Sequence, residues 1–153
     1  MSYAGFWKRF AAAFIDLLIT AFPCWIAGGI SGFIYAESTG TVVGAKFAGE
    51  IAGTLVGWIY FSSFESSAKQ ATLGKMALGI KVTDIDGSRI EFGKATLRHF
   101  GKIVSFLTLF IGYVMIAFTE KKQGLHDKMA GCLVVNKLEG KDRSEYSTLR
   151  SPH

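Results

Sequence analysis

The chain has 153 residues, enough for one small domain, and half of them are hydrophobic. The net charge of +5 would suit a nucleic-acid-binding protein. However, the basic residues flank apolar segments and there is no arginine-rich arm or aromatic RNA-binding signature, so we expect no nucleic-acid partner. The two cysteines, Cys24 and Cys132, lie far apart and form no CxxC motif, so a structural disulfide is not expected.

The first apolar run covers residues 10–36 and contains a single charge, Asp16. A helix rises about 1.5 Å per residue and the hydrocarbon core is about 30 Å thick, so the run predicts a transmembrane helix over about residues 8–35. The intramembrane carboxylate and the lack of a clear small-x-small cleavage site favour an uncleaved anchor over a signal peptide. Arg9 precedes Asp16 by seven residues, so both are expected on one helix face, around a polar interior.

A second predicted span covers about residues 42–64. Both spans carry glycines at four-residue spacing, which form surfaces by which helices approach closely. These are Gly28 and Gly32 in the first span and Gly49, Gly53 and Gly57 in the second. We expect them to pack against each other or against a second copy of the chain.

Lys46 and Glu50 in the second span are spaced for an i, i+4 pair near the outer interface. The run after Glu50 is short and uncharged, so this carboxylate is expected about one turn inside the membrane. Glu50 is therefore a secondary functional candidate; the alternative is a snorkelling interface pair.

Residues 65–102 are polar and carry seven Lys or Arg against four acids. Apolar and polar residues alternate over 79–84 and again over 88–92, and Asp86-Gly87 between them is a tight-turn signal. This pattern predicts a small cytoplasmic β-hairpin within residues 72–93.

Residues 94–107 predict an amphipathic helix with a basic stripe of Lys94, Arg98 and Lys102. Such a helix suits the headgroup region of an anionic membrane surface. Arg98 could alternatively turn inward to meet a carboxylate.

The third apolar segment, residues 103–119, has 17 uncharged residues and is barely long enough to span. Lys8 and Arg9 predict a cytoplasmic N-terminus, and both 65–102 and 120–153 carry seven basic residues. A re-entrant or interfacial helical hairpin over 97–120, bent near Gly112, would keep all three on the cytoplasmic side. A true third span is the alternative.

A short helix over 124–131 and a strand over 132–136 follow, and residues 138–153 form a polar tail. This strand can pair with the strand at residues 80–82 only if both lie on one side of the membrane, which also favours the interfacial interpretation. The sequence thus predicts a mainly α-helical membrane protein with one domain, residues 1–137.

Several short motifs occur in a specific order and spacing. They are Arg9 before Phe-Ala-Ala-Ala-Phe-Ile-Asp16, Thr72-Leu-Gly-Lys75, Gly79-Ile-Lys-Val, Asp86-Gly87, Leu97-Arg98 and Gly124-Leu-His-Asp127. Over residues 4–136 the chain resembles the RDD family of bacterial membrane proteins, named for one arginine and two aspartates. By motif position these are Arg9, Asp16 and Asp127. The resemblance implies the bacterial inner membrane and, for a family of mostly unassigned function, cation or proton exchange. Glu50 has no place in the family pattern.

Asp16 is the strongest site candidate. Burial raises the pKa of a carboxyl unless a cation is near, and Arg9 or an inward Arg98 would keep it ionised. Competition of a cation or proton for that partner would permit exchange; alternatively, Arg9 and Asp16 form a permanent structural ion pair.

His126 and Asp127 are neighbours on the predicted short helix. They could form a proton relay or contact a lipid headgroup. Their side chains point roughly 100° apart, so they are poor joint ligands for one ion. Alternatively, Asp127 caps the helix or pairs with a basic residue such as Lys75, fixing the cytoplasmic cap.

Two functional hypotheses remain. The chain could be an oligomeric transporter of monovalent cations or protons with an Arg9/Asp16/Glu50 interior, because two spans cannot enclose a path alone. It could instead be a membrane scaffold or accessory subunit that binds a protein or lipid partner. No nucleophile–base arrangement, metal-ligand spacing or cofactor motif is present, so we expect no enzymatic activity.

Overall fold

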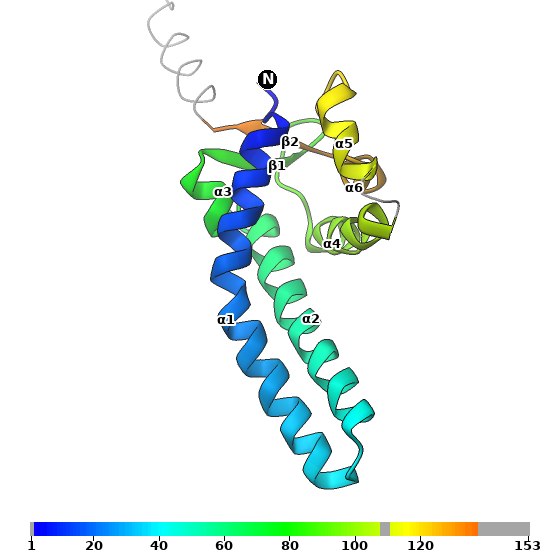
Figure 1. Ribbon diagram of the computed structural model, residues 1–153. Coiled ribbons are helices and arrows are strands. Elements are labelled where there is room, and N and C mark those ends of the chain that lie inside the picture. Colours follow the sequence, from blue (N-terminus) through cyan, green and yellow to red (C-terminus); the bar gives the residue numbers. More distant parts are fainter. Residues whose placement is uncertain (1, 108–110, 138–153) are drawn as a thin grey trace, which may run out of the picture.

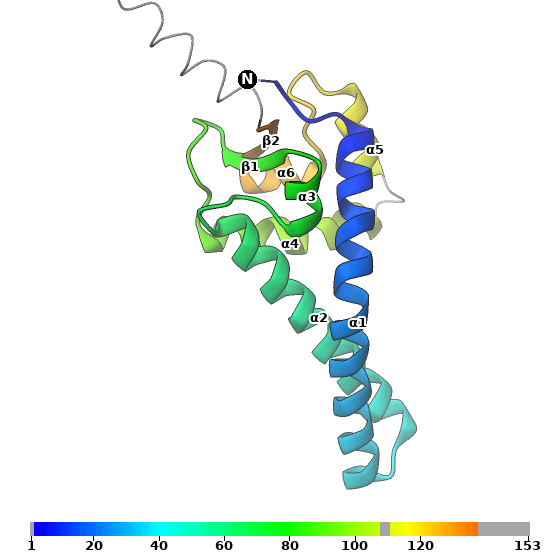
Figure 2. The same ribbon diagram turned by 90° about the vertical axis from the view of Figure 1, so that its left-hand side faces the viewer.

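The computed structural model describes residues 2–107 and 111–137. Two long helices, α1 (Phe6–Thr39) and α2 (Val42–Ser66), form an antiparallel hairpin. The remaining elements gather into a cap at the end opposite the connecting loop (Figures 1 and 2). In chain order they are α3 (Leu73–Ala77), β1 (Ile80–Asp84), α4 (Phe92–Leu107), α5 (Ile111–Phe118), α6 (Leu125–Ala130) and β2 (Cys132–Asn136). The fold is therefore mainly helical, with a small sheet. The predicted tail, 138–153, lies outside the described residues.

The hairpin is long and apolar. By composition and length, both of its helices could cross a membrane. At about 1.5 Å per residue, α1 is about 51 Å long and α2 about 37 Å, against a hydrocarbon core of about 30 Å. The longer helix therefore extends well beyond the core, and its excess length lies at the cap end.

Glycines bring the two helices into backbone contact. A Cβ atom built on Gly28 would lie 3.0 Å from the carbonyl oxygen of Gly49, and one on Gly32 would lie 3.0 Å from that of Ala45. A Cβ on Gly53 would lie 3.5 Å from the nearest atom, a backbone oxygen of α1, whereas one on Gly57 would meet nothing within 4 Å. Gly28, Gly32, Gly49 and Gly53 thus face the partner helix, whereas Gly57 does not pack closely against it.

The sheet pairs β1 with β2 in antiparallel register, from Ile80 opposite Asn136 to Asp84 opposite Cys132. The predicted pairing of these two segments is therefore confirmed, but the predicted β-hairpin is wrong. A tight turn does follow β1, with Gly87 at a φ of 88°. Beyond the turn, residues 89–91 are not extended into a strand but lead directly into α4, so β2 supplies the second strand.

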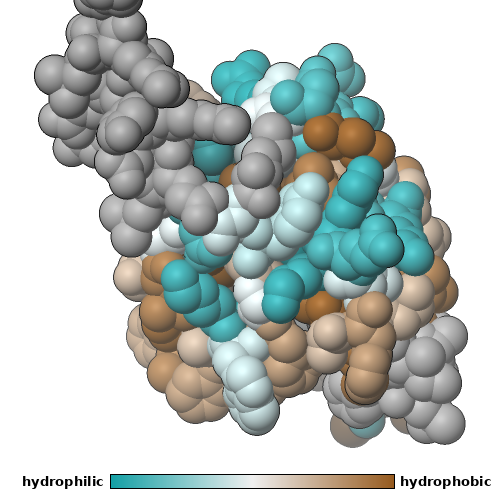
Figure 3. Space-filling model, turned by 90° about the horizontal axis from the view of Figure 1, so that it is seen from above, coloured by the Kyte–Doolittle hydropathy of each residue, from teal (hydrophilic) through white to brown (hydrophobic). Residues whose placement is uncertain are grey.

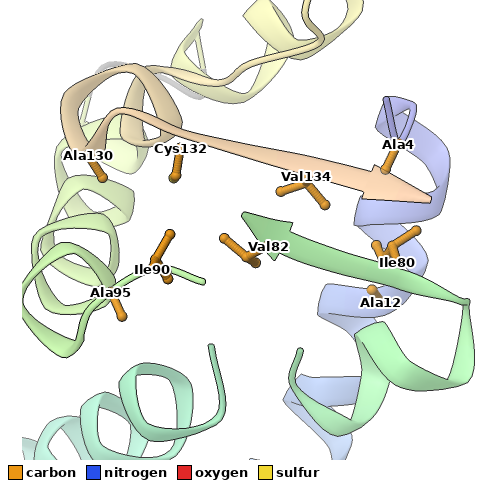
Figure 4. Close-up of a cluster of buried hydrophobic side chains, with 9 residues drawn as sticks. All are labelled: Ala4, Ala12, Ile80, Val82, Ile90, Ala95, Ala130, Cys132 and Val134. Carbon is orange, nitrogen blue, oxygen red and sulfur yellow. The ribbon is translucent and has the colours of Figure 1, made fainter. Parts of the chain in front are cut away.

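A small apolar core joins the sheet to the helices around it (Figure 4). Val82 and Val134 lie between α1 on one side and α4 and α6 on the other, and both are fully buried. Ala12 of α1 packs into the same cluster, so the N-terminal turns of α1 belong to the cap as well as to the hairpin.

The third apolar segment forms two helices, α4 and α5, rather than one long helix. Both lie at the cap end of the hairpin in Figures 1 and 2. Trp58 of α2 donates a hydrogen bond from Nε1 to Thr96 Oγ1 of α4, at 3.1 Å. Gly112, where we expected a bend, lies inside α5, and residues 108–110 are outside the described residues. Among the described residues, only α1 and α2 have the length and composition of a span.

Candidate functional site: a buried ionic network and its cavity

Arg98 is the centre of a buried ionic network at the cap end of the hairpin. Its side chain is 3% exposed. Nε donates to Asp127 Oδ1 of α6 and Nη1 donates to Glu65 Oε2 of α2, both at 2.8 Å. Arg98 thus takes the inward orientation, which the sequence left open, and ties α4 to two other elements.

Arg9 of α1 shares the Asp127 carboxylate. Its Nη1 donates to Asp127 Oδ2, and its Nε donates to the carbonyl oxygen of Ala4 at 3.0 Å. Asp127 Oδ2 also accepts the backbone N–H of Gly124 at 3.2 Å, which caps α6. The expected ion pair between Arg9 and Asp16 does not form. Their spacing does put both on one face, where they line the same cavity, but α6 brings a different carboxylate to Arg9.

Glu65 is the second carboxylate of the network and was missed from the sequence. It is 1% exposed and accepts a hydrogen bond from Lys75 Nζ, while Lys102 Nζ lies 3.6 Å from Oε1. Lys75 therefore pairs with Glu65 and not with Asp127. A signal for Glu65 was present. It lies in the last turn of a long helix, where the helix dipole disfavours negative charge, so a nearby cation is needed.

Asp16 is fully buried, yet no ion pair to it occurs among the described residues. Oδ1 accepts from the Tyr60 hydroxyl and from the backbone N–H of Gly74, each at 2.8 Å, and Oδ2 accepts from Thr72 Oγ1 at 2.5 Å. A Cβ on Gly74 would lie only 2.3 Å from the carbonyl oxygen of Ala12. The Thr-Leu-Gly-Lys motif thus docks α3 onto α1 through the Asp16 carboxylate.

Glu50 is not part of this site. Its side chain is 60% exposed, and its nearest cation, Lys46 Nζ, is 4.0 Å away and 79% exposed. Glu50 also precedes Tyr60, which contacts Asp16, by ten residues, or about 15 Å along the helix. The interior formed by Arg9, Asp16 and Glu50 that the sequence suggested is therefore not assembled within one chain.

The surroundings of the network change how its members ionise. Burial, reinforced by neighbouring Arg98, lowers the pKa of Lys75 to about 7. Burial opposes ionisation of Asp127, but Arg98 and Arg9 outweigh it and hold the pKa of that carboxyl below its usual range. Burial lowers the pKa of His126 to about 3, so this imidazole is neutral at pH 7 and adds no charge.

A cavity of about 480 Å³ opens beside the network. Four cationic side chains line it, with Asp16 as the one carboxylate among the described lining residues. The cations are Arg9, Lys75, Arg98 and Lys102. The rest of the lining is mostly apolar, and includes Phe6, Phe10, Ala13, Phe61, Val114 and Ile116. Asp16, Glu65 and Asp127 together offset three of the four positive charges, which leaves a formal excess of one cation when Lys75 is protonated.

Comparison with known proteins places this site in a family context. The family model described as "RDD family" matches residues 3–131. The chain is 35% identical to the uncharacterized protein YxaI of Bacillus subtilis, over 88% of this chain and 97% of that protein. It is 28% identical to the uncharacterized membrane protein YteJ of the same organism, over 88% and 82% of the two chains. No solved structure matches the chain significantly.

Proposed function

The chain belongs to the RDD family of membrane proteins, and from this premise we propose that it is a non-enzymatic, membrane-anchored accessory protein. In this proposal the α1–α2 hairpin is the anchor, and the cap binds a lipid or protein partner at one membrane face. The observation that carries the proposal is the position of the ionic network: every charged side chain that bridges α1, α2, α4 and α6 lies at the cap end.

The depth of the network supports an anchoring role. A hydrocarbon core of about 30 Å takes up about 20 residues of helix. Twenty residues counted from the connecting loop end near Thr20 in α1 and near Ser62 in α2, which marks the boundary of the hydrocarbon core at the cap end. Asp16, Arg9 and Glu65 all lie beyond this boundary. Between these boundaries α1 is charged only at Glu37, beside the connecting loop. α2 is charged there only at Lys46 and Glu50, which lie in its loop-end half and are both exposed. Within one chain, the charged groups therefore do not extend into a path along the hairpin.

The orientation of α4 agrees with this depth. Its apolar side chains Leu97, Phe100, Ile103 and Val104 are each 41–47% exposed. Phe100 lines a pocket with Leu55 and Trp58 of α2, so this apolar face is turned toward the loop end of the hairpin. An amphipathic helix in that orientation lies in the headgroup region, with its apolar face toward the hydrocarbon core and the rest of the cap on the aqueous side. Seen from above, hydrophilic residues gather over the middle of the cap's outer face (Figure 3).

The distribution of basic residues predicts the side of the membrane on which the cap lies. Lys8 and Arg9 precede the first span, and the cap sequence between residues 65 and 102 carries seven basic residues. By the positive-inside rule, we place the N-terminus, the cap and the C-terminal tail on the cytoplasmic side of the bacterial inner membrane.

Cation or proton exchange by a homo-oligomer is the second candidate. One observation favours it: Asp16 is a fully buried carboxylate held by neutral donors and facing a cavity. The path would then have to be completed by a second copy of the chain or by a membrane-protein partner.

Flux measurements separate the two candidates. Purified protein is reconstituted into liposomes, and the internal pH is followed under imposed sodium or potassium gradients. We expect no pH change above that of protein-free liposomes. A flux that is lost in Asp16→Asn but retained in Asp86→Asn, a matched change in the exposed turn, would overturn the accessory function and establish exchange.

A further inference from the structure

The cavity beside the network has the chemistry of an anion site with an apolar wall. Resting on the proposed binding function, we infer that it binds the phosphate group of an anionic phospholipid. Its volume of about 480 Å³ falls within the range of about 300–1,000 Å³ typical of small-molecule sites.

The polar lining has more donors than acceptors. Arg9 Nη2 is buried and has no hydrogen-bond partner among the described residues, and the Arg9 side chain is 8% exposed. A buried guanidinium N–H without a partner is costly, and a phosphate oxygen is the acceptor that guanidinium groups bind best. Burial, and to a lesser extent Arg98, lowers the pKa of Lys75 to about 7, so a positive charge on this side chain is unfavourable in the cavity. An anion in the cavity would relieve both conditions.

The apolar lining distinguishes a lipid phosphate from a free one. Phe10 and Val114 line the cavity and are also 57% and 48% exposed, so the apolar wall reaches the protein surface. Inorganic phosphate would gain nothing from such a wall. The glycerol and first acyl carbons of a phospholipid would bury apolar surface against it.

The membrane-facing end of the cavity lies at the depth of lipid phosphates. Asp16 lies about one turn beyond the estimated hydrocarbon boundary, where headgroups begin, and Arg9 lies about two turns farther out. Lys102 also lines the cavity, and it belongs to α4, which we place in the headgroup region. A lipid of the adjoining leaflet could therefore enter the cavity beside Asp16 and Lys102, with its phosphate raised toward the Arg9 guanidinium and its glycerol and first acyl carbons against the apolar wall.

The test measures binding to the full chain in detergent micelles. The melting temperature is followed while short-chain phosphatidylglycerol, short-chain phosphatidylcholine or inorganic phosphate is added. The variants are Lys102→Gln, which removes a cation from the cavity, and Lys94→Gln, a matched change on the same helix whose lysine pairs with Asp84 outside the cavity. A third variant, Arg9→Lys, keeps the charge but removes the unpartnered N–H. Circular dichroism confirms that each variant is folded.

We expect phosphatidylglycerol to raise the melting temperature, with at most a small effect of phosphatidylcholine. Lys102→Gln and Arg9→Lys should weaken binding about tenfold, as expected for loss of a charge-assisted hydrogen bond, and Lys94→Gln should leave it unchanged. Three results would each overturn the inference. The two lipids could raise the melting temperature equally, Lys102→Gln and Lys94→Gln could weaken binding equally, or inorganic phosphate could bind as well as phosphatidylglycerol. If lipid binding fails in this test and the liposome experiment shows no flux, the inference is wrong but the proposed accessory function stands. If the liposomes show flux that depends on Asp16, the accessory function itself is refuted.

Discussion

Replacing Glu65 with glutamine tests whether the network holds the cap to the hairpin. The change keeps the shape of the side chain but removes the charge that faces Arg98 and Lys75. Removing one partner of a buried ion pair costs about 3–5 kcal/mol, because the other charge is left uncompensated. Glutamine retains one acceptor oxygen, so we expect the lower end of this range, a loss of about 3 kcal/mol in the free energy of unfolding.

The chain supplies its own control for this change. Glu50→Gln alters a glutamate on the same helix that is 60% exposed and 4.0 Å from its lysine, so it should change stability by at most about 0.5 kcal/mol. Both variants are unfolded with denaturant in detergent micelles and followed by circular dichroism. If Glu65→Gln and Glu50→Gln have the same midpoint and slope, the network does not hold the cap, and the reasoning is refuted.

Three further predictions concern the same region. Gly74→Ala should lower the melting temperature strongly or prevent folding, because its Cβ would lie 2.3 Å from a backbone oxygen of α1, whereas Gly57→Ala should be neutral or slightly stabilising. Lys75 binds fewer protons folded than unfolded between pH 7 and its ordinary pKa of 10.5, so stability should rise from pH 7 to pH 9, and Lys75→Met should reduce that rise. Burial lowers the pKa of His99 to about 4 and of His126 to about 3, so melting temperatures should fall from pH 7 to pH 5, less so in His126→Gln.

The sequence predicted the parts of the fold that depend on local pattern. The long apolar runs gave both hairpin helices, since length and hydropathy alone decide which segments can cross a bilayer. The alternation at residues 79–84 and the short apolar run at residues 132–135 predicted the two strands, and their pairing followed from placing both on one side of the membrane. The β-hairpin was wrong because the turn at Asp86-Gly87 is real but does not determine which segment pairs with β1. That choice is made by long-range packing, which a local pattern does not record.

The site was predicted only in part, for a related reason. Helical spacing correctly put Arg9 and Asp16 on one face, but it does not reveal which distant carboxylate reaches Arg9. Asp127 and Arg98 were singled out through the family resemblance and the basic stripe, and the structure brings both to the network. Glu65 was taken as the start of a polar loop, since only the neighbouring elements show that it is buried.

The depth of the network in the bilayer tests the account most directly. Single spin labels are placed at exposed positions by Phe10→Cys, Ile30→Cys and Phe100→Cys, in a chain whose two native cysteines are replaced by alanine. Accessibility to oxygen and to a water-soluble relaxant then gives the depth of each label in liposomes. We predict that the label at position 30 lies near the bilayer centre, the label at position 100 at one headgroup boundary, and the label at position 10 farther out on the same side, accessible to the water-soluble relaxant. Labels at 10 and 100 near the bilayer centre would contradict an interfacial network and place its charges inside the membrane.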